Sequence, residues 1–376
     1  MSRTLDGHSR ILVTGGAGFI GQNFVHHLVR HAPGAHIVVL DALTYAANPT
    51  SLKPLQDTGQ VVFKRGDITD LAHMQQLFEA HRFDTVAHLA AESHVDRSIS
   101  GPDAFIQTNI IGTYNLLKTA LADWKARDLM QTARFLHVST DEVFGDLEMD
   151  EPAFHEESPY KPSSPYSASK ASSDHLARAF MRTYGLPVLV TNCSNNYGPY
   201  QHPEKLIPLM ILNALRGQKL PIYGDGLNVR DWLHVSDHCN ALTLVLEGGR
   251  LGRTYNVGGG AERANREVVA AICAAIDQAF AADPDLARRY PDCPAAKGQP
   301  VASLVHHVQD RPGHDRRYAI DPRRLAQELG YQPRETFEQG LSQTVAWYIA
   351  NDGWWLQALS AGFRDWVEAN YGKRGD

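Results

Sequence analysis

The chain has little cysteine and no long apolar run, and each shortage excludes a class of protein. Its cysteines are far apart and contain no C-x-x-C pair, so neither a disulfide framework nor a zinc site is indicated. They are Cys193, Cys239, Cys273 and Cys293. The polar start of the chain lacks the apolar stretch of a secretory signal. The longest nearly apolar helical stretch, Val268–Phe280, is interrupted by Asp277 and is too short to span a bilayer. We therefore expect a cytoplasmic location and no membrane partner.

Charge of one sign is also never concentrated. The 36 Lys and Arg residues face 42 Asp and Glu, giving a formal net charge of −6 without a like-charge run of five. This balance argues against nucleic acid as the main partner. The histidines of the first helical segment, His26, His27 and His31, have no convergent metal-ligand spacing, so no metal is expected. The 376 residues are 43% hydrophobic, which allows two domains, or one large core with a smaller appendage, and either can bury ample apolar surface.

Short apolar runs alternate with helical-period segments in the first half, which predicts βαβ units. The predicted strands are Ile11–Thr14, Ile37–Leu40, Val61–Phe63, Thr85–Leu89, Phe135–Ser139 and Val188–Thr191. We predict an α/β protein with a doubly wound parallel-sheet Rossmann domain over 1–194, to which 229–260 returns in part. A smaller C-terminal α/β domain, mainly 195–376, would hold the substrate. Ala282–Pro300, rich in Pro and Asp, is expected to be a surface excursion. Ligands should bind at the carboxyl ends of the strands.

A glycine-rich turn follows the first predicted strand and opens a helix. Gly15, Gly18 and Gly21 have the spacing G-x-x-G-x-x-G, which lets the backbone approach a pyrophosphate at a helix N-terminus. Taken alone, it is also compatible with an ordinary glycine turn. Asp41 ends the second strand, where a carboxylate can bind the adenosine ribose and favour NAD over NADP, or merely cap its loop. Asp67-Ile68 lies at the next strand end, near the expected adenine or in a surface turn.

Tyr166 and Lys170 are four positions apart, directly after the helix-start sequence Ser163-Ser164-Pro165. This spacing places the phenol and the ammonium on one helix face. A neighbouring ammonium and a nicotinamide cation both favour the phenolate. Tyr166 could then remove a hydroxyl proton while hydride leaves the same carbon for NAD⁺.

Two adjacent carboxylates follow the fifth strand in the sequence Thr140-Asp141-Glu142. In a continuing strand they would face opposite sides, so we predict that the backbone turns there. Paired carboxylates can act as an acid and a base when their environments differ, which is what the elimination of water requires. Beside a 4-keto group, Glu142 could remove the C5 proton and a protonated Asp141 could protonate the C6 hydroxyl. A solvated acidic loop is the alternative.

With these motifs in place, the chain resembles the extended short-chain dehydrogenase/reductases over nearly its whole length. The motifs that carry the resemblance are Gly15–Gly21, Leu40–Ala46, Ala90–Ser98, Ser139–Val143, Pro165–Lys170, Thr191–Tyr200, Tyr223–His234 and Asp310–Tyr318. The resemblance implies a hydro-lyase that converts dTDP-glucose to dTDP-4-keto-6-deoxyglucose, with NAD reduced and reoxidised in each turnover. It also implies a homodimer formed through a four-helix bundle of Pro102–Lys125 and Tyr166–Tyr184. One departure is Phe144, where the family usually has Tyr.

The same resemblance implies two sets of binding residues. The cofactor set is Gly15, Gly18, Phe19, Ile20, Gly21, Asp41, Ala42, Leu43, Thr44, Asp67, Ile68, Leu89, Ala90, Ala91, Thr108, Tyr166, Lys170 and Asn196. The nucleotide-sugar set is Ser93, Thr140, Asn195, Lys205, Leu206, Pro221, Ile222, Tyr223, Arg230, Asn265, Asp310, Arg311 and His314. In the second set, Lys205, Arg230 and Arg311 supply the cations that a diphosphate needs. Tyr223 could stack on a pyrimidine or simply pack.

Several alternatives remain open from the residues. A nucleotide-sugar 4-epimerase would need Tyr166 and Lys170 but not the carboxylate pair, and a UDP-glucose 4,6-dehydratase would differ only in the base. A catalytically idle NAD-binding regulator would have no need of the retained acid, base and redox set.

Overall fold

The computed structural model describes residues 3–310 and 314–359. The described chain forms two compact units. Unit 1 takes Met1–Ser194, Ser236–Gly258 and Tyr318–Gln332, and unit 2 takes Asn195–Val235, Gly259–Arg317 and Pro333–Asp376. Unit 1 therefore includes part of the 229–260 range and also 318–332, a return that the sequence analysis had placed in the C-terminal domain.

Unit 1 is built on a seven-stranded sheet in which all neighbouring strands are parallel, in the order β10-β6-β5-β4-β1-β2-β3. The strands are β1 (Arg10–Thr14), β2 (His36–Asp41), β3 (Val61–Arg65), β4 (Thr85–His88), β5 (Arg134–Thr140), β6 (Val188–Cys193) and β10 (Thr254–Val257). Because helices cover both faces, the strands read as continuous apolar runs. The six predicted strands and the parallel Rossmann architecture are confirmed, and β10 is an additional strand.

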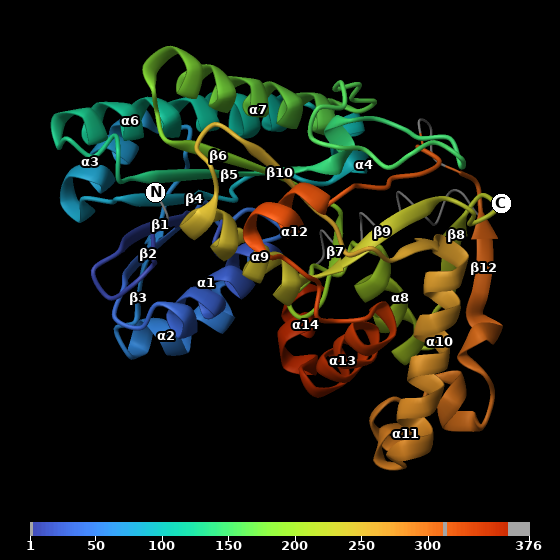
Figure 1. Cartoon of the computed structure of the whole chain (residues 1–376). Helices are drawn as coiled ribbons and strands as arrows, with labels where there is room; N and C mark the ends of the chain where they lie inside the picture. Colours follow the sequence, from blue (N-terminus) through green and yellow to red (C-terminus); the bar gives the residue numbers. More distant parts are fainter. Residues whose placement is uncertain (1–2, 311–313, 360–376) are drawn as a thin grey trace. The chain divides into compact units, whose positions relative to one another are not determined.

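Helices pack on both faces of this sheet. They are α1 (Phe19–His31), η1 (Pro49–Leu52), α2 (Lys53–Asp57), α3 (Leu71–His81), α4 (Val95–Ser100), α5 (Asp103–Phe105), η2 (Ile106–Gly112), α6 (Thr113–Ala126), η3 (Asp141–Val143), α7 (Pro165–Tyr184), α9 (Val235–Gly248) and α12 (Arg323–Leu329). Figure 1 shows α3, α6 and α7 on one face and α1 on the other. Leu116 and Leu117 of α6 are fully buried in the core against Phe135.

The strand order reverses between β1 and β4. From β1 the chain steps through β2 to β3 in one direction, and β4, β5, β6 and β10 extend the sheet in the other. In a doubly wound sheet, the crevice at such a reversal is where ligands bind. The segments that leave the carboxyl ends of β1 and β4 therefore border the expected binding site.

Unit 2 contains a three-stranded sheet ordered β11-β9-β7 and a two-stranded sheet of β12 and β8. The strands are β7 (Asn195–Tyr197), β8 (Leu220–Tyr223), β9 (Val229–His234), β11 (Glu262–Ala264) and β12 (Val305–Val308). The helices are α8 (Leu206–Leu215), α10 (Asn265–Ala282), α11 (Asp285–Arg289), η4 (Pro294–Lys297), η5 (Val301–Leu304), α13 (Phe337–Ala350) and α14 (Asp352–Ala358). Its core joins α8, α10 and α13 through side chains such as Ile211, Ile272 and Val345.

The expectation that Ala282–Pro300 is a surface excursion is wrong. Leu286, Tyr290 and Cys293 of this stretch are buried in the core of unit 2. The Pro and Asp residues that indicated a loop stand at the start of α11 and in the turn that follows, while the apolar residues between them anchor the segment. The segment is polar on average, and this hid the three apolar residues that pack into the core.

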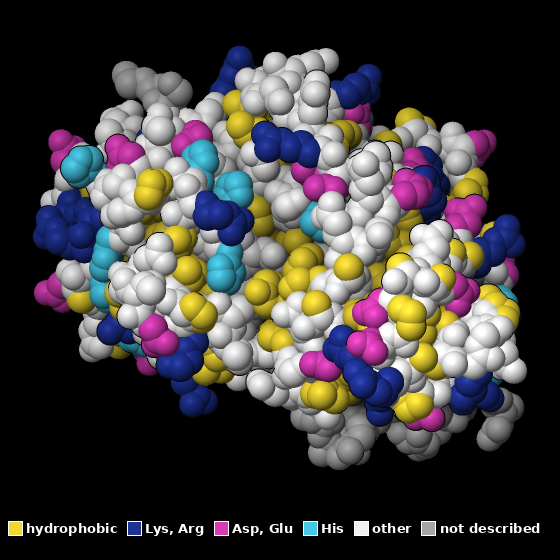
Figure 2. All heavy atoms as spheres, turned by 90° about the horizontal axis from the view of Figure 1, so that it is seen from below, with side chains coloured by type: hydrophobic (Ala, Val, Ile, Leu, Met, Phe, Trp, Pro, Cys, Tyr) yellow, Lys and Arg dark blue, Asp and Glu magenta, His cyan; other side chains and the backbone are white. Residues whose placement is uncertain are grey.

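Further features concern membrane segments, cysteines, metal ligands and surface charge. No helix among residues 3–310 and 314–359 is long and apolar enough to cross a membrane. The four cysteines carry free thiols and are buried. In the same described part of the chain, no group of three or more His, Cys, Asp or Glu side chains is arranged to hold a metal ion. On the face shown in Figure 2, acidic and basic side chains intermingle.

Candidate active site

The glycine turn after β1 is packed so tightly that two of its glycines have no room for a side chain. Gly15 has φ +68°, and a Cβ there would lie 2.6 Å from the Ala90 nitrogen that follows β4. A Cβ at Gly21 would lie 2.1 Å from the Gly15 carbonyl oxygen. Gly18 precedes α1 and has no side chain to cap the helix. The first-turn N–H groups of α1 are thus left for an anion, as a dinucleotide pyrophosphate requires.

Asp41 at the end of β2 braces this turn. One carboxylate oxygen accepts a hydrogen bond from the Ala17 N–H at 2.9 Å, and the other accepts from the Leu43 N–H at 2.8 Å. Burial raises the pKa of Asp41, although both backbone bonds lower it. The alternative role of a loop cap is therefore observed: Asp41 caps its own loop and also holds the glycine turn. Each carboxylate oxygen keeps a second lone pair with which it can bind a ribose hydroxyl.

The segment after β4 lies directly beside β1. The Leu89 N–H donates to the Thr14 carbonyl at 3.1 Å, and the Ala90 N–H donates to the Thr14 hydroxyl at 3.3 Å. Asp67 is exposed and accepts from the Thr69 N–H at 2.8 Å, the geometry of a surface turn. The other residues of the two predicted sets that belong to unit 1 lie at the start of α1, after β2, β3 and β4, and in η2. They are Phe19, Ile20, Ala42, Thr44, Ile68, Ala91, Ser93 and Thr108.

Tyr166 and Lys170 lie on α7, whose start follows the predicted pattern. Ser164 is the N-cap, its hydroxyl accepts from the Ser167 N–H at 3.1 Å, and Pro165 occupies the first helical position. Both side chains are buried, and the Lys170 ammonium donates to the Val138 carbonyl of β5 at 2.9 Å. The helix start predicted from Ser163-Ser164-Pro165 is confirmed.

The backbone turns at the end of β5, as predicted. The strand ends at Thr140, and Asp141–Val143 form a 3₁₀ turn in which the Thr140 hydroxyl accepts from the Glu142 N–H at 3.3 Å. Asp141 is only 2% exposed and Glu142 is half-buried. A freely solvated acidic loop does not describe this geometry.

Both carboxylates influence the pKa of the Tyr166 phenol. Burial is the largest influence and raises the pKa of Tyr166 well above its ordinary value; the charges of Glu142 and Asp141 raise it further, while a hydrogen bond with the Thr140 hydroxyl lowers it. Burial lowers the pKa of Lys170, against the charge of Asp174, which raises it. The expected promotion of the phenolate by the ammonium therefore does not dominate. In the protein alone, Tyr166 is a neutral phenol at physiological pH.

Sequence reasoning missed a group of buried polar residues beneath Tyr166 and Lys170. The group centres on Asp174, one further helical turn along the same face of α7, and includes His137 of β5 and Asn192 of β6. The four-residue spacing from Tyr166 through Lys170 to Asp174 was the available signal.

The remaining predicted residues belong to unit 2. They are Asn195, Asn196, Lys205, Leu206, Pro221, Ile222, Tyr223, Arg230, Asn265, Asp310 and His314. Arg230 is buried and donates to the Asp315 carbonyl at 2.9 Å. The Tyr223 ring meets His314 edge to face at 6.0 Å, and the His314 ring lies 2.6 Å from the Asp310 carboxylate. Arg311 lies outside the described residues.

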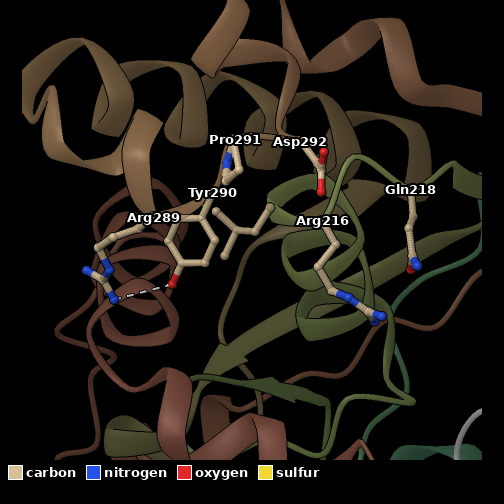
Figure 3. Close-up of a pocket in the computed structure, with 7 residues that line it drawn as sticks. Arg216, Gln218, Arg289, Tyr290, Pro291 and Asp292 are labelled. Carbon is tan, nitrogen blue, oxygen red and sulfur yellow. Dashed lines mark hydrogen bonds between the residues drawn. The ribbon is translucent and has the colours of Figure 1, made fainter.

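Unit 2 also has a depression that contains none of the predicted residues (Figure 3). It is lined by Leu215, Arg216, Gln218, Arg289, Tyr290, Pro291 and Asp292. Arg289 donates to the Tyr290 hydroxyl at 3.4 Å and to Asp352 at 3.1 Å, so its charge is already engaged by neighbours. The chemistry predicted for this chain is not located there.

Comparison with known proteins gives consistent results. Residues 12–344 match the sequence model of the family described as GDP-mannose 4,6 dehydratase. The chain is 54% identical over 357 residues to a dTDP-glucose 4,6-dehydratase of Neisseria meningitidis serogroup B, covering 94% of this chain and 97% of that protein. It is 56% identical over 355 residues to a dTDP-glucose 4,6-dehydratase of Xanthomonas campestris pv. campestris, with the same coverage of 94% and 97%.

Solved structures agree with these sequence matches. A dTDP-glucose 4,6-dehydratase from Bacillus anthracis, in complex with NAD, is 44% identical with a TM-score of 0.79, covering 93% of this chain and 100% of that chain. A UDP-glucose 4-epimerase from Thermotoga maritima is 27% identical with a TM-score of 0.75, covering 90% and 98%.

Proposed function

Because this chain belongs to the dTDP-glucose 4,6-dehydratase family, we propose that it converts dTDP-glucose to dTDP-4-keto-6-deoxyglucose with loss of water. The observation that carries the proposal is the turn at Thr140, which places Asp141 and Glu142 within electrostatic reach of Tyr166. A 4-epimerase, the fold's other common activity among the solved relatives, has no use for that carboxylate pair.

NAD is the cofactor in this proposal, and the residues of unit 1 fit it. The close approach of Gly15 and Gly21 to neighbouring backbone leaves no room for a Cβ at either position and keeps the turn, which we call the glycine cradle, as tight as a dinucleotide fingerprint requires. We assign the pyrophosphate to the first-turn N–H groups of α1 and the adenosine ribose to Asp41. When bound, NAD supplies the hydride acceptor for C4 and the hydride donor for C6.

Oxidation at C4 requires a base for the hydroxyl proton, a role that we assign to Tyr166. Burial and the nearby carboxylates oppose ionisation of the phenol, so the site must supply compensating positive charge. Lys170 provides it as a fixed ammonium held by the Val138 carbonyl. The Thr140 hydroxyl, which hydrogen-bonds Tyr166, stabilises the phenolate further.

Elimination across C5 and C6 is assigned to the carboxylate pair. Glu142 takes the C5 proton, which the adjacent ketone acidifies, and the C6–O bond breaks. Asp141 donates its proton to the departing hydroxyl, so that water leaves and a C5–C6 double bond forms. We assign the acid role to Asp141, which is the more deeply buried of the two, and the base role to the more exposed Glu142.

We assign recognition of the nucleoside diphosphate to unit 2. Lys205 and Arg230 supply cations for the phosphates, and Tyr223 supplies an aromatic face for the pyrimidine. A thymine rather than a uracil base is proposed on the strength of family membership.

A homodimer is part of the proposal. The predicted helices carry exposed apolar side chains on η2, α6 and α7. They are Ile106, Ile111, Tyr114 and Tyr184. Paired across a two-fold axis, such residues would form an apolar interface. We also propose a cytoplasmic location, since four free thiols fit a reducing compartment.

The test is an assay of purified protein with dTDP-glucose, UDP-glucose and GDP-mannose, each without added reductant. We expect a 4-keto-6-deoxy product from dTDP-glucose. The Glu142→Gln variant should halt after C4 oxidation and accumulate bound NADH, because the C5 proton loses its base. Turnover of another nucleotide sugar alone would reassign the substrate. Full elimination by Glu142→Gln would refute the assignment of the base.

A further inference from the structure

Asp174 is the centre of a buried polar cluster in unit 1. Its side chain has 0% exposure, and its Oδ1 lies 3.0 Å from His137 Nε2. Its Oδ2 accepts from the Tyr160 hydroxyl at 2.8 Å and from the Asn192 side-chain amide at 3.2 Å. The donors come from β5, from the loop before α7 and from β6, so one carboxylate ties three elements together.

This carboxylate is the buried anion of the cluster. Burial alone would raise the pKa of Asp174, but the hydrogen bond from His137 and the charge of Lys170 outweigh it and lower that pKa. Burial and Lys170 lower the pKa of His137. Asp174 opposes this shift, and His137 donates its Nε2 proton to Asp174, since a carboxylate can only accept. Lys170, one helical turn away from Asp174, is also buried; burial lowers its pKa, and the charge of Asp174 opposes that shift.

The cluster also reaches the turn that presents the carboxylate pair. The Asn192 amide that donates to Asp174 donates to the Thr140 carbonyl as well, at 3.0 Å. A contact thus runs from Asp174 through Asn192 to the residue at which β5 ends and η3 begins. A fully buried ion is costly to desolvate, and well-packed apolar residues often stabilise a fold as well or better. Stability alone is therefore a weak explanation for this arrangement.

We propose that Asp174 is a positioning residue for both stages of the reaction: it keeps Lys170 cationic beneath Tyr166 and, through Asn192, fixes the Thr140 turn that presents Asp141 and Glu142. The inference rests on the proposed function of those residues. In this role Asp174 contacts neither the substrate nor the cofactor and acts through Lys170 and Asn192. The cluster couples the oxidation site to the elimination site within unit 1.

The test compares Asp174→Asn, which keeps the shape and removes the charge, with Asp84→Asn. Asp84 immediately precedes β4, at the amino end of the strands, and its carboxylate accepts from the Arg10 N–H at 3.1 Å. We expect Asp174→Asn to slow both single-turnover C4 oxidation and elimination by at least about tenfold, with little change in KM. The low-pH limb of the kcat profile should move up by about one unit, because Tyr166 loses support for its phenolate. Asp84→Asn should leave rates and profile unchanged.

Other titratable groups surround the cluster, and the profile must be read against all of them. They are Tyr166 and Arg178 on α7, His88 on β4, His137 on β5, Cys193 on β6, Tyr160 before α7, and Asp141 and Glu142 in η3. Asp174 acts directly on His137, Tyr160 and Lys170, so the substitution alters their titration as well, and the profile is read together with the two single-turnover rates.

A second variant keeps the proposal testable if Asp174→Asn does not fold. Asn192→Ala removes the link to Thr140 but leaves the carboxylate, and we expect it to slow elimination several-fold more than C4 oxidation. Rates within about twofold of wild type and an unshifted pH profile in folded Asp174→Asn would overturn the proposal. So would equal slowing of both stages by Asn192→Ala. Failure of the wild-type protein to act on dTDP-glucose would instead refute the proposed function.

Discussion

The substitution Gly21→Ala tests the glycine cradle directly. The added Cβ would lie 2.1 Å from the Gly15 carbonyl oxygen and 2.7 Å from the Gly16 Cα, and both neighbours are backbone. The contact must lengthen by about 1 Å to reach van der Waals separation, which no side-chain rotation can provide. Overpacking of this kind costs about 1–3 kcal/mol. For a unit of this size, we expect melting to fall by about 2–4 °C per kcal/mol.

The same displacement moves the first-turn amides of α1 that we assign to the pyrophosphate. A shift of about 1 Å exceeds the tolerance of a hydrogen bond. One lost charge-assisted bond is worth about 1.5–3 kcal/mol, so we expect NAD to bind at least about tenfold more weakly. Differential scanning fluorimetry and calorimetric titration with NAD measure the two effects.

The control is Gly101→Ala. A Cβ at Gly101 would meet its nearest neighbour, the Arg97 carbonyl oxygen, at 3.9 Å, an ordinary contact. This variant should retain the melting temperature and the NAD affinity of the wild type. If Gly21→Ala behaves like Gly101→Ala in both measurements, the cradle is not the rigid element that we describe.

Two further predictions concern stability. His238 is fully buried, and burial lowers its pKa to about 3. Below pH 6.5 this histidine is therefore protonated in the unfolded chain but not in the folded chain. The free energy of unfolding falls by about 1.4 kcal/mol per pH unit as the pH drops from 6.5 toward 3. Urea unfolding from pH 7 to pH 5 should show a steeper loss for the wild type than for His238→Gln, and parallel curves would contradict this. Phe144 is fully buried, stacked on Phe154 and edge-on to Tyr160. Restoring the family's usual residue by Phe144→Tyr should lower unfolding free energy by about 1–3 kcal/mol while leaving turnover intact, because a hydroxyl enters an apolar site; unchanged stability would reveal a partner for that hydroxyl.

The sheet was predictable because its signal is local. Each of β1 to β6 is a short apolar run bounded by polar turns, and buried parallel strands read in that way whatever lies around them. β10 was not predicted because Thr254–Val257 is short, contains polar residues and lies far along the chain from its neighbour β6.

The turn at Thr140 could be predicted by a different argument. Two adjacent carboxylates in a strand would face opposite sides, so shared chemistry demanded a bend, and the structure has one. The helix start at Ser164-Pro165 was equally local. The roles of the individual side chains remain predictions, since they depend on ligands.

The Asp174 cluster could not be assembled from sequence. Its members come from β5, β6 and α7, and only the strand order makes β5 and β6 neighbours. The pattern located Tyr166 and Lys170 through their spacing, but a third polar residue at the next turn is ordinary in any helix. Tertiary contacts alone give Asp174 its significance.

The chain passes between the two units after Ser194, Val235, Gly258, Arg317 and Gln332. The ribosome therefore completes the first sheet only after it has made the whole first segment of unit 2, Asn195–Val235. Until β10 emerges, the nascent chain displays the bare edge of β6, a template on which another polypeptide can add a strand. Until β10 is made, a chaperone that covers this edge would protect the chain most. A chain truncated after β6 would expose the edge permanently.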